Sequence, residues 1–307
     1  MDIHHYLAST MQRWGSDSML VRAALRYSSR GVRLHFCNGQ IDVVRDRAVI
    51  RLAARHLAYV PDVAHNFDRY FTQVEPIEDG DRMLVDFSQP RLHRYRGSGL
   101  QFEFTSLVEE IDALDGYFRW YTPQPGDTVF DIGAYCGASV YRLSTLVGTT
   151  GKVVAFEPDP LNFQLLERNL ARHGVSNVVS VAAAVADYTG TAAFFAEGAL
   201  GSTITTHSSR GSASEKVEVI TLTLADACER YGTPSFAKVD IEGAEIAMLE
   251  SARSFLAEHP IHFALDTNHN VGKGLTAPAV EDVFRSIGYR TESSDSSGCM
   301  TTWASPS

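Results

Sequence analysis

The second half of the sequence predicts an α/β fold with a doubly wound, mostly parallel sheet. From residue 127 onward, short apolar runs alternate with segments of helical periodicity, which is typical of βαβ units. The first run, Val129 to Ile132, leads through a glycine loop into a helical segment, as in folds that bind ligands at the carboxyl ends of their strands. Strands are expected at residues 128–132, 152–156, 178–185, 217–222, 237–241 and 261–265. Helices are expected at residues 138–146, 160–173, 224–231, 244–257 and 278–287.

The first 80 residues are expected to form a helical and β-hairpin extension, with the main domain at 81–307. Residues 5–30 carry apolar side chains at helical spacing, and Asn38-Gly39 between alternating segments is a strong hairpin signal. Residues 49–57 predict a helix that ends before Pro61. The aromatic segment 66–71 could be a loop that covers a site, but the preferred interpretation is a satellite cluster packed on the core. We expect the extension to help shape the acceptor site.

The region between the extension and the glycine loop predicts two strands and a helix. The strands are at residues 83–87 and 100–104, and the helix spans 108–121 before Pro123. The basic stretch 89–99 between the strands is interpreted as a solvated connection, with binding of an acidic substrate as the alternative. Residues 289–292 and 300–303 predict a closing hairpin.

Composition excludes several classes of protein. A net charge of −10 disfavours a nucleic-acid partner, because phosphate binding needs a basic surface. No apolar run is long enough to span a membrane, and the N-terminus lacks a secretion signal, so we expect a cytoplasmic protein. The scattered cysteines form no Cys-x-x-Cys pair and predict neither structural zinc nor a disulfide framework. A homo-oligomer is compatible with the sequence. The four cysteines are Cys37, Cys136, Cys228 and Cys299.

The glycine loop favours a cationic ligand. It lacks the full G-x-G-x-x-G pattern of dinucleotide folds, and Asp131 stands just before its first glycine. A carboxylate at that position repels a pyrophosphate but attracts a cation. S-adenosylmethionine carries a sulfonium and an ammonium, so it is the expected cofactor. The alternative is an ordinary strand-to-helix turn.

An acidic residue follows each of five predicted strands, and together these residues predict a negative rim at the ligand-binding edge. Any one of them alone is better explained as a helix N-cap. Glu157, after the second strand, is placed to accept from ribose hydroxyls, and Asp187, after the third, to meet an adenine amino group. The five residues are Asp131, Glu157, Asp187, Asp240 and Asp266.

Three motifs together resemble the FkbM-type S-adenosylmethionine-dependent methyltransferases. They are Asp-Ile-Gly-Ala-x-x-Gly at 131–137, Phe-Glu-Pro-Asp-Pro at 156–160 and Lys-x-Asp-x-Glu-Gly-Ala-Glu at 238–245. The resemblance covers about residues 120–270 and implies a seven-stranded sheet with an antiparallel last strand. It also implies methyl transfer, usually to a hydroxyl of a natural product or a sugar.

The resemblance also implies roles for particular residues. The methionine end of the cofactor would lie against the glycine loop, the ribose at Glu157, the adenine near Asp187 and the reacting centre at Asp240. Where the family often has Glu-x-His after the fifth strand, this sequence has Asp266, Thr267, Asn268 and His269. The loop residues implied at the methionine end are Asp131, Gly133, Ala134 and Gly137.

A hydroxyl acceptor must lose its proton, and His269 is the first candidate for the general base, with Asp240 the second. His262, at the start of the same strand, is expected to point away from the site. Oxygen ligands such as Glu242 and Asp266 would permit a magnesium site with Asp240 and His269, but no required metal is expected. A nicotinamide-dependent oxidoreductase and a non-catalytic binding module are the alternative functions.

Overall fold

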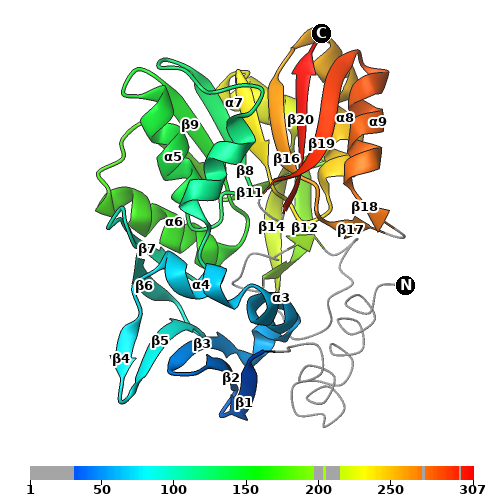
Figure 1. Cartoon of the computed structure of the whole chain (residues 1–307). Helices are drawn as coiled ribbons and strands as arrows, with labels where there is room; N and C mark the ends of the chain where they lie inside the picture. Colours follow the sequence, from blue (N-terminus) through cyan, green and yellow to red (C-terminus); the bar gives the residue numbers. More distant parts are fainter. Residues whose placement is uncertain (1–30, 197–202, 205–214, 272–273, 297–298) are drawn as a thin grey trace. The chain divides into compact units, whose positions relative to one another are not determined.

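The computed structural model describes residues 31–196, 203–204, 215–271, 274–296 and 299–307 (Figure 1). The helix expected within residues 5–30 lies outside the described residues. By packing, the described residues form two compact units: residues 31–108 belong to the first, and those from Glu109 onward, except Glu215, to the second. Among the described helices, none is long and apolar enough to cross a membrane.

The first unit contains a five-stranded sheet in the order β1-β2-β3-β5-β4. The predicted hairpin at Asn38-Gly39 is confirmed: both residues have positive φ, 50° and 74°, as the tight turn between β1 and β2 requires. The predicted domain boundary at residue 80 falls in the turn between β4 and β5, which pair antiparallel. The division at residues 80 and 81 stays a prediction. The strands are β1 Arg33–Cys37, β2 Gln40–Arg45, β3 Ala48–Ala53, β4 Ile77–Asp79 and β5 Arg82–Phe87.

Two expectations for the first unit are wrong. The predicted helix at 49–57 is the strand β3 followed by a 3-10 helix, η1 (Ala54–Tyr59). A short apolar run fits either structure, and pairing with β2 on one side and β5 on the other selects the strand. The predicted loop at 66–71 belongs instead to a helix, α4 (Phe67–Gln73), which follows α3 (Val60–His65). Phe67 is buried and stacks on Phe71, so the aromatic residues pack within this unit.

The basic stretch 89–99 also differs from the prediction. It contains a strand, β6 (Arg91–Arg94), which pairs antiparallel with β7 (Gln101–Phe104). Within this hairpin His93 is buried, with its ring 5.2 Å from that of Phe87 between centroids. The stretch is therefore not a solvated connection throughout. The strands predicted on either side of it are confirmed as β5 and β7.

The second unit confirms the predicted fold class. Its seven-stranded sheet has the order β10-β9-β8-β15-β16-β20-β19, and β20 runs antiparallel to β16. The closing hairpin is β19 paired with β20. The strands are β8 Thr128–Ile132, β9 Lys152–Phe156, β10 Val178–Val181, β15 Phe236–Val239, β16 His262–Asp266, β19 Tyr289–Ser296 and β20 Cys299–Pro306.

Helices cover both faces of this sheet (Figure 1). Successive residues of β8 point to opposite faces of the sheet. Phe130 packs with α7, α8 and α9 on one face, whereas Val129 packs with α5 and α6 on the other. This alternation explains why the central strands are apolar throughout. The helices are α5 Ala138–Val147, α6 Pro160–Arg172, α7 Leu224–Tyr231, α8 Glu245–Glu258 and α9 Ala277–Ser286.

The helix predicted at 108–121 is only a 3-10 segment, η2 (Ile111–Phe118). The indole N–H of Trp303 on β20 donates to the carbonyl oxygen of Gly116 at 3.1 Å. In an α-helix this carbonyl would instead accept a hydrogen bond from the backbone N–H of the residue four positions later. The short 3-10 segment η2 is therefore found together with a hydrogen bond from a residue far away in the sequence.

The third predicted strand, at 178–185, is divided between two sheets. β10 joins the main sheet, whereas β11 (Ala183–Ala186) pairs with β14 (Glu215–Thr223) in a separate sheet of order β11-β14-β12-β13. The expected rim of five acids on one sheet is therefore wrong, because Asp187 follows β11 and is exposed. The remaining strands are β12 Gly190–Ala196, β13 Thr203–Ile204, β17 Asn270–Val271 and β18 Gly274–Leu275.

Candidate active site

The candidate site lies where the sheet reverses its strand order. β8 has β9 on one side and β15 on the other, and all three run parallel. In open α/β sheets this switch point leaves a space at the carboxyl ends of the strands, where ligands bind. The loops that follow β8, β9, β15 and β16 meet at this edge.

The glycine loop after β8 packs directly on the loop after β15. Gly133 has φ +86°, and a Cβ atom there would lie 1.9 Å from the backbone oxygen of Asp240. The Asp240 N–H donates to the carbonyl of Ile132 at 2.8 Å, which continues the strand pairing into the two loops. Gly137 has φ +89°, and its Cβ would lie 2.5 Å from the Cδ1 of Leu166. Both glycines are therefore required by close approach as well as by backbone conformation.

Asp131 is paired with a lysine that the sequence interpretation did not use. The two residues are register partners on β8 and β15, and Lys238 Nζ lies 3.2 Å from Asp131 Oδ1. Both side chains are buried. Burial lowers the pKa of Lys238, but Asp131, Asp240 and Glu109 outweigh that effect and raise it above its usual value. Lys238 is thus a permanent cation beside the glycine loop, and the role of Asp131 at the methionine end stays a prediction.

Glu157 joins the loops after β8 and β9. Its carboxylate accepts from the N–H of Tyr135 at 2.8 Å, from the N–H of Asp159 at 2.9 Å and from the Asn162 amide at 3.4 Å. Burial, and then the charge of Asp159, raise the pKa of Glu157 to about 8. A carboxylate offers about four acceptor positions. One therefore remains for a further donor such as a sugar hydroxyl.

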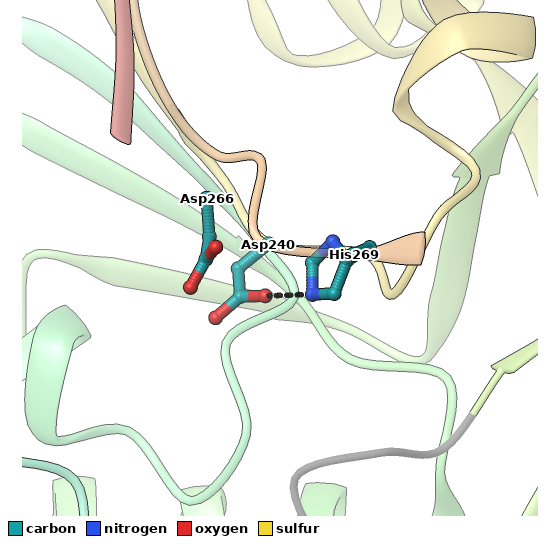
Figure 2. A group of neighbouring side chains, drawn as sticks. All are labelled: Asp240, Asp266 and His269. Carbon is teal, nitrogen blue, oxygen red and sulfur yellow. Dashed lines mark ion pairs between the residues drawn. The ribbon is translucent and has the colours of Figure 1, made fainter. Parts of the chain in front are cut away.

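His269 lies among carboxylates at the ends of β15 and β16. Its Nδ1 is 2.9 Å from Glu245 Oε1, and its Nε2 is 3.6 Å from Asp240 Oδ1 and 3.8 Å from Glu242 Oε2. Figure 2 shows Asp240 and His269 facing each other, with Asp266 beside Asp240. Burial lowers the pKa of His269, but the three carboxylates together raise it well above its usual value. The ring is therefore an imidazolium in the free protein at neutral pH.

Glu245 is a site residue that the sequence interpretation missed. It is fully buried as the first residue of α8, and it accepts from the N–H groups of Ile241 at 3.3 Å and Gly243 at 3.1 Å. These bonds fix the carboxylate that contacts His269. The available signal was the final Glu of the 238–245 motif. Glu242, two residues before the helix N-cap, has φ +55°, an uncommon conformation that costs about 1–3 kcal/mol and is frequent at functional sites.

Asp266 completes the cluster in Figure 2. One ligand atom from each of Asp240, Asp266 and His269 lies within 4.8 Å of the others, so the three residues are close enough to ligate one ion. Burial, and then the charge of Asp240, raise the pKa of Asp266 to about 7. An imidazolium has no lone pair for a metal, so in the free protein His269 is a poor ligand.

A second missed residue is Glu109, whose Oε2 accepts from the N–H of Ala138 at 3.1 Å. It stands 29 positions before its partner, and no local pattern connects the two. His262 lies at the opposite end of β16, stacked on Tyr121 and bonded to Ser305, as expected for a residue outside the site. Asp187 is the one predicted cofactor residue that follows a strand of another sheet. The predicted residues that do meet at this edge are Asp131, Gly133, Ala134, Gly137, Glu157, Asp240 and His269.

Residues 131–291 match the family model described as the methyltransferase FkbM domain, which covers just over half of the chain. The chain belongs to the FkbM methyltransferase family. Membership of this family implies S-adenosylmethionine as the cofactor, so the choice between that cofactor and a nicotinamide is decided for the former. The matched range contains every site residue that the sequence predicted.

Individual relatives are more distant. Over 77 residues, 24% of this chain, the FkbM protein is 38% identical to ribosomal RNA large subunit methyltransferase E of Halorhodospira halophila. It is similar to the crystal structure of methyltransferase FkbM from Methylobacillus flagellatus, with 16% identity, 95% of this chain covered and a TM-score of 0.47. An S-adenosylmethionine-dependent O-methyltransferase from Thermotoga maritima has 14% identity and a TM-score of 0.39, over 71% of this chain and 78% of that one. The chain spans 34% of the curated relative and 60% of the Methylobacillus protein.

Proposed function

We propose that this FkbM protein transfers the methyl group to a hydroxyl oxygen of a small molecule. The observation that supports this proposal is the pairing of His269 with the buried Glu245 beside Asp240, at the carboxyl ends of β15 and β16. A hydroxyl is a weak nucleophile until its proton leaves, so this acceptor needs a base in the site.

The residues at the sheet edge fit the cofactor. S-adenosylmethionine supplies an electrophilic methyl group on a sulfonium. We assign its methionine part to Asp131, Gly133, Ala134 and Gly137, its ribose to Glu157, and its adenine to the region of Asp187. The position of these residues in the loop after β8 supports this assignment, because ligands of open α/β sheets bind at the carboxyl ends of the strands. The spare acceptor position of Glu157 suits one ribose hydroxyl.

His269 can act as a base only after it has lost its own proton. The negative charge of Glu245, 2.9 Å from Nδ1, favours a proton on that nitrogen, which would leave Nε2 as the accepting atom on the side of Asp240. A cation bound beside Asp240 and Glu242 would stabilise the same carboxylates that stabilise the imidazolium. Its binding would therefore lower the pKa of His269 and favour the neutral, basic ring.

The proposal is tested with S-adenosylmethionine that carries an isotopically labelled methyl group and matched panels of hydroxyl, amine and carbon acceptors. We expect label in a methyl ether, located by mass spectrometry and NMR, with one demethylated cofactor formed per ether. Label on nitrogen or carbon alone would contradict the hydroxyl assignment. A protein that binds the cofactor but transfers nothing to any panel would favour the non-catalytic binding module.

Replacing Glu157 with alanine is expected to weaken S-adenosylmethionine binding. The ribose hydroxyl would be left without its hydrogen-bond partner, which costs roughly 1–3 kcal/mol, about 5- to 150-fold in affinity. Isothermal calorimetry measures the change, and Glu167→Gln on the exposed face of α6 is the matched control. If Glu157→Ala binds the cofactor as tightly as the parent, the ribose assignment is wrong.

A further inference from the structure

Glu109 approaches the glycine loop from a segment that the family match does not include. Its carboxylate accepts from the N–H of Ala138, the first residue of α5. The residue before the helix is Gly137, which has no side chain with which to cap it. A carboxylate that is remote in sequence therefore lies at the point where the loop becomes the helix.

The same place contains a group of charged side chains, of which Lys238 and Asp131 are buried. Lys238 pairs with Asp131 at 3.2 Å, and its Nζ lies 5.6 Å from the ring centre of Tyr117, on η2. The carboxylates of Glu109, Asp131 and Asp240 all act electrostatically on Lys238. Within this group of four described residues, carboxylates outnumber the ammonium. Such a group attracts a further cation.

We infer that Glu109 is a cofactor-binding residue, whose carboxylate binds the α-ammonium of the methionine part of S-adenosylmethionine. The inference rests on the proposed placement of that part at the glycine loop. Glu109 then has two functions, because it also caps α5 through Ala138. The segment that carries it becomes part of the cofactor site along with the four strand-end loops.

Binding of the cofactor ammonium at Glu109 is expected to release protons. Burial raises the pKa of Glu109, Lys238 lowers it and Asp131 raises it, with a result of about 7. Part of the population therefore carries a proton on this group at pH 7. A bound ammonium stabilises the carboxylate and lowers its pKa, so cofactor binding at pH 7 releases up to about half a proton from this group.

The test compares three nucleosides by calorimetry. S-adenosylmethionine and S-adenosylhomocysteine both carry the ammonium, whereas 5′-methylthioadenosine lacks the amino acid. Glu109→Gln keeps an oxygen for the Ala138 N–H, so the cap is preserved. We expect this variant to bind the first two about 10- to 100-fold more weakly and methylthioadenosine as the parent does. The control is Asp115→Asn. Asp115 is an exposed residue of η2 that pairs with Arg142, and its replacement should change none of the three affinities.

Proton release is measured on the same proteins, from titrations of S-adenosylhomocysteine at pH 7 in buffers of different ionisation enthalpy. The parent should release more protons than Glu109→Gln, by up to about half a proton per site. Equal weakening for all three nucleosides, or unchanged binding of S-adenosylhomocysteine, would overturn the inference and leave Glu109 as a helix cap. A parent protein that itself does not distinguish S-adenosylhomocysteine from methylthioadenosine would refute instead the placement of the methionine part.

Discussion

His269→Ala is expected to lower turnover about 10²- to 10⁴-fold, with little change in the affinity for S-adenosylmethionine. The variant lacks the imidazole that we propose as the base, whereas the glycine loop and Glu157 remain. Single-turnover kinetics and calorimetry measure the two quantities separately. A matched control is His262→Ala at the far end of β16, which should leave turnover within a few-fold of the parent.

The pH profile identifies the base more sharply than the rate alone. On the proposed mechanism only the neutral ring of His269 reacts, so kcat/KM, which reports the free protein, should rise with pH through a pKa above the usual histidine value. Glu245→Gln removes one of the charges that raise this pKa, so the rising limb should move to lower pH. Glu250→Gln, on the exposed part of the same helix, should leave the limb in place. A His269→Ala protein with near-normal turnover and the parent's profile would assign the role to Asp240 or to no base.

Treatment with a chelator tests whether the enzyme needs a metal ion at Asp240, Asp266 and His269. We expect methyl transfer to continue after chelation, because the charged ring of His269 is a poor ligand for an ion between Asp240 and Asp266. Activity that is lost and then recovered with magnesium would show that these residues bind a metal, and His269 would act as a ligand.

Gly133→Ala is expected to have the largest effect on stability. The new Cβ would lie 1.9 Å from the backbone oxygen of Asp240, and the backbone there has φ +86°. Neither backbone segment can yield without separating the loops after β8 and β15. We expect a loss on the order of 3 kcal/mol or more in the free energy of unfolding, which is roughly 6–12 °C in melting temperature. Cofactor affinity should fall with it, since the same loop is assigned to the methionine part.

Gly174→Ala is the matched control for that experiment. Gly174 follows α6 with φ +63°, and a Cβ there would meet nothing within 4 Å. This variant therefore reports the backbone strain alone, about 1–2 kcal/mol. Equal melting temperatures for the two alanine variants would show that the loops can separate easily and that the close approach at Gly133 has no energetic consequence.

The sequence alone predicted the sheet edge on which the site stands. Alternation of strands and helices implied parallel strands, whose carboxyl ends lie at one edge, so residues far apart in sequence could be expected to meet. Asp240 and His269 do meet there, and the glycine positions have the positive φ that the loop requires. Signals of this kind are local: periodicity, a turn residue, or an acid directly after an apolar run.

The tertiary structure decided which side chains contact each other in the site and therefore which of them are charged. Lys238 faces Asp131 because β8 and β15 pair in that register, and Glu245 contacts His269 because α8 begins beside the end of β16. Glu109 lies 29 positions before Ala138, from whose N–H it accepts a hydrogen bond. Protonation depends on burial and on neighbours from other elements, which no local pattern contains. For the same reason the position of Asp187 could not be predicted, since the chain passes from one sheet to another between β10 and β11.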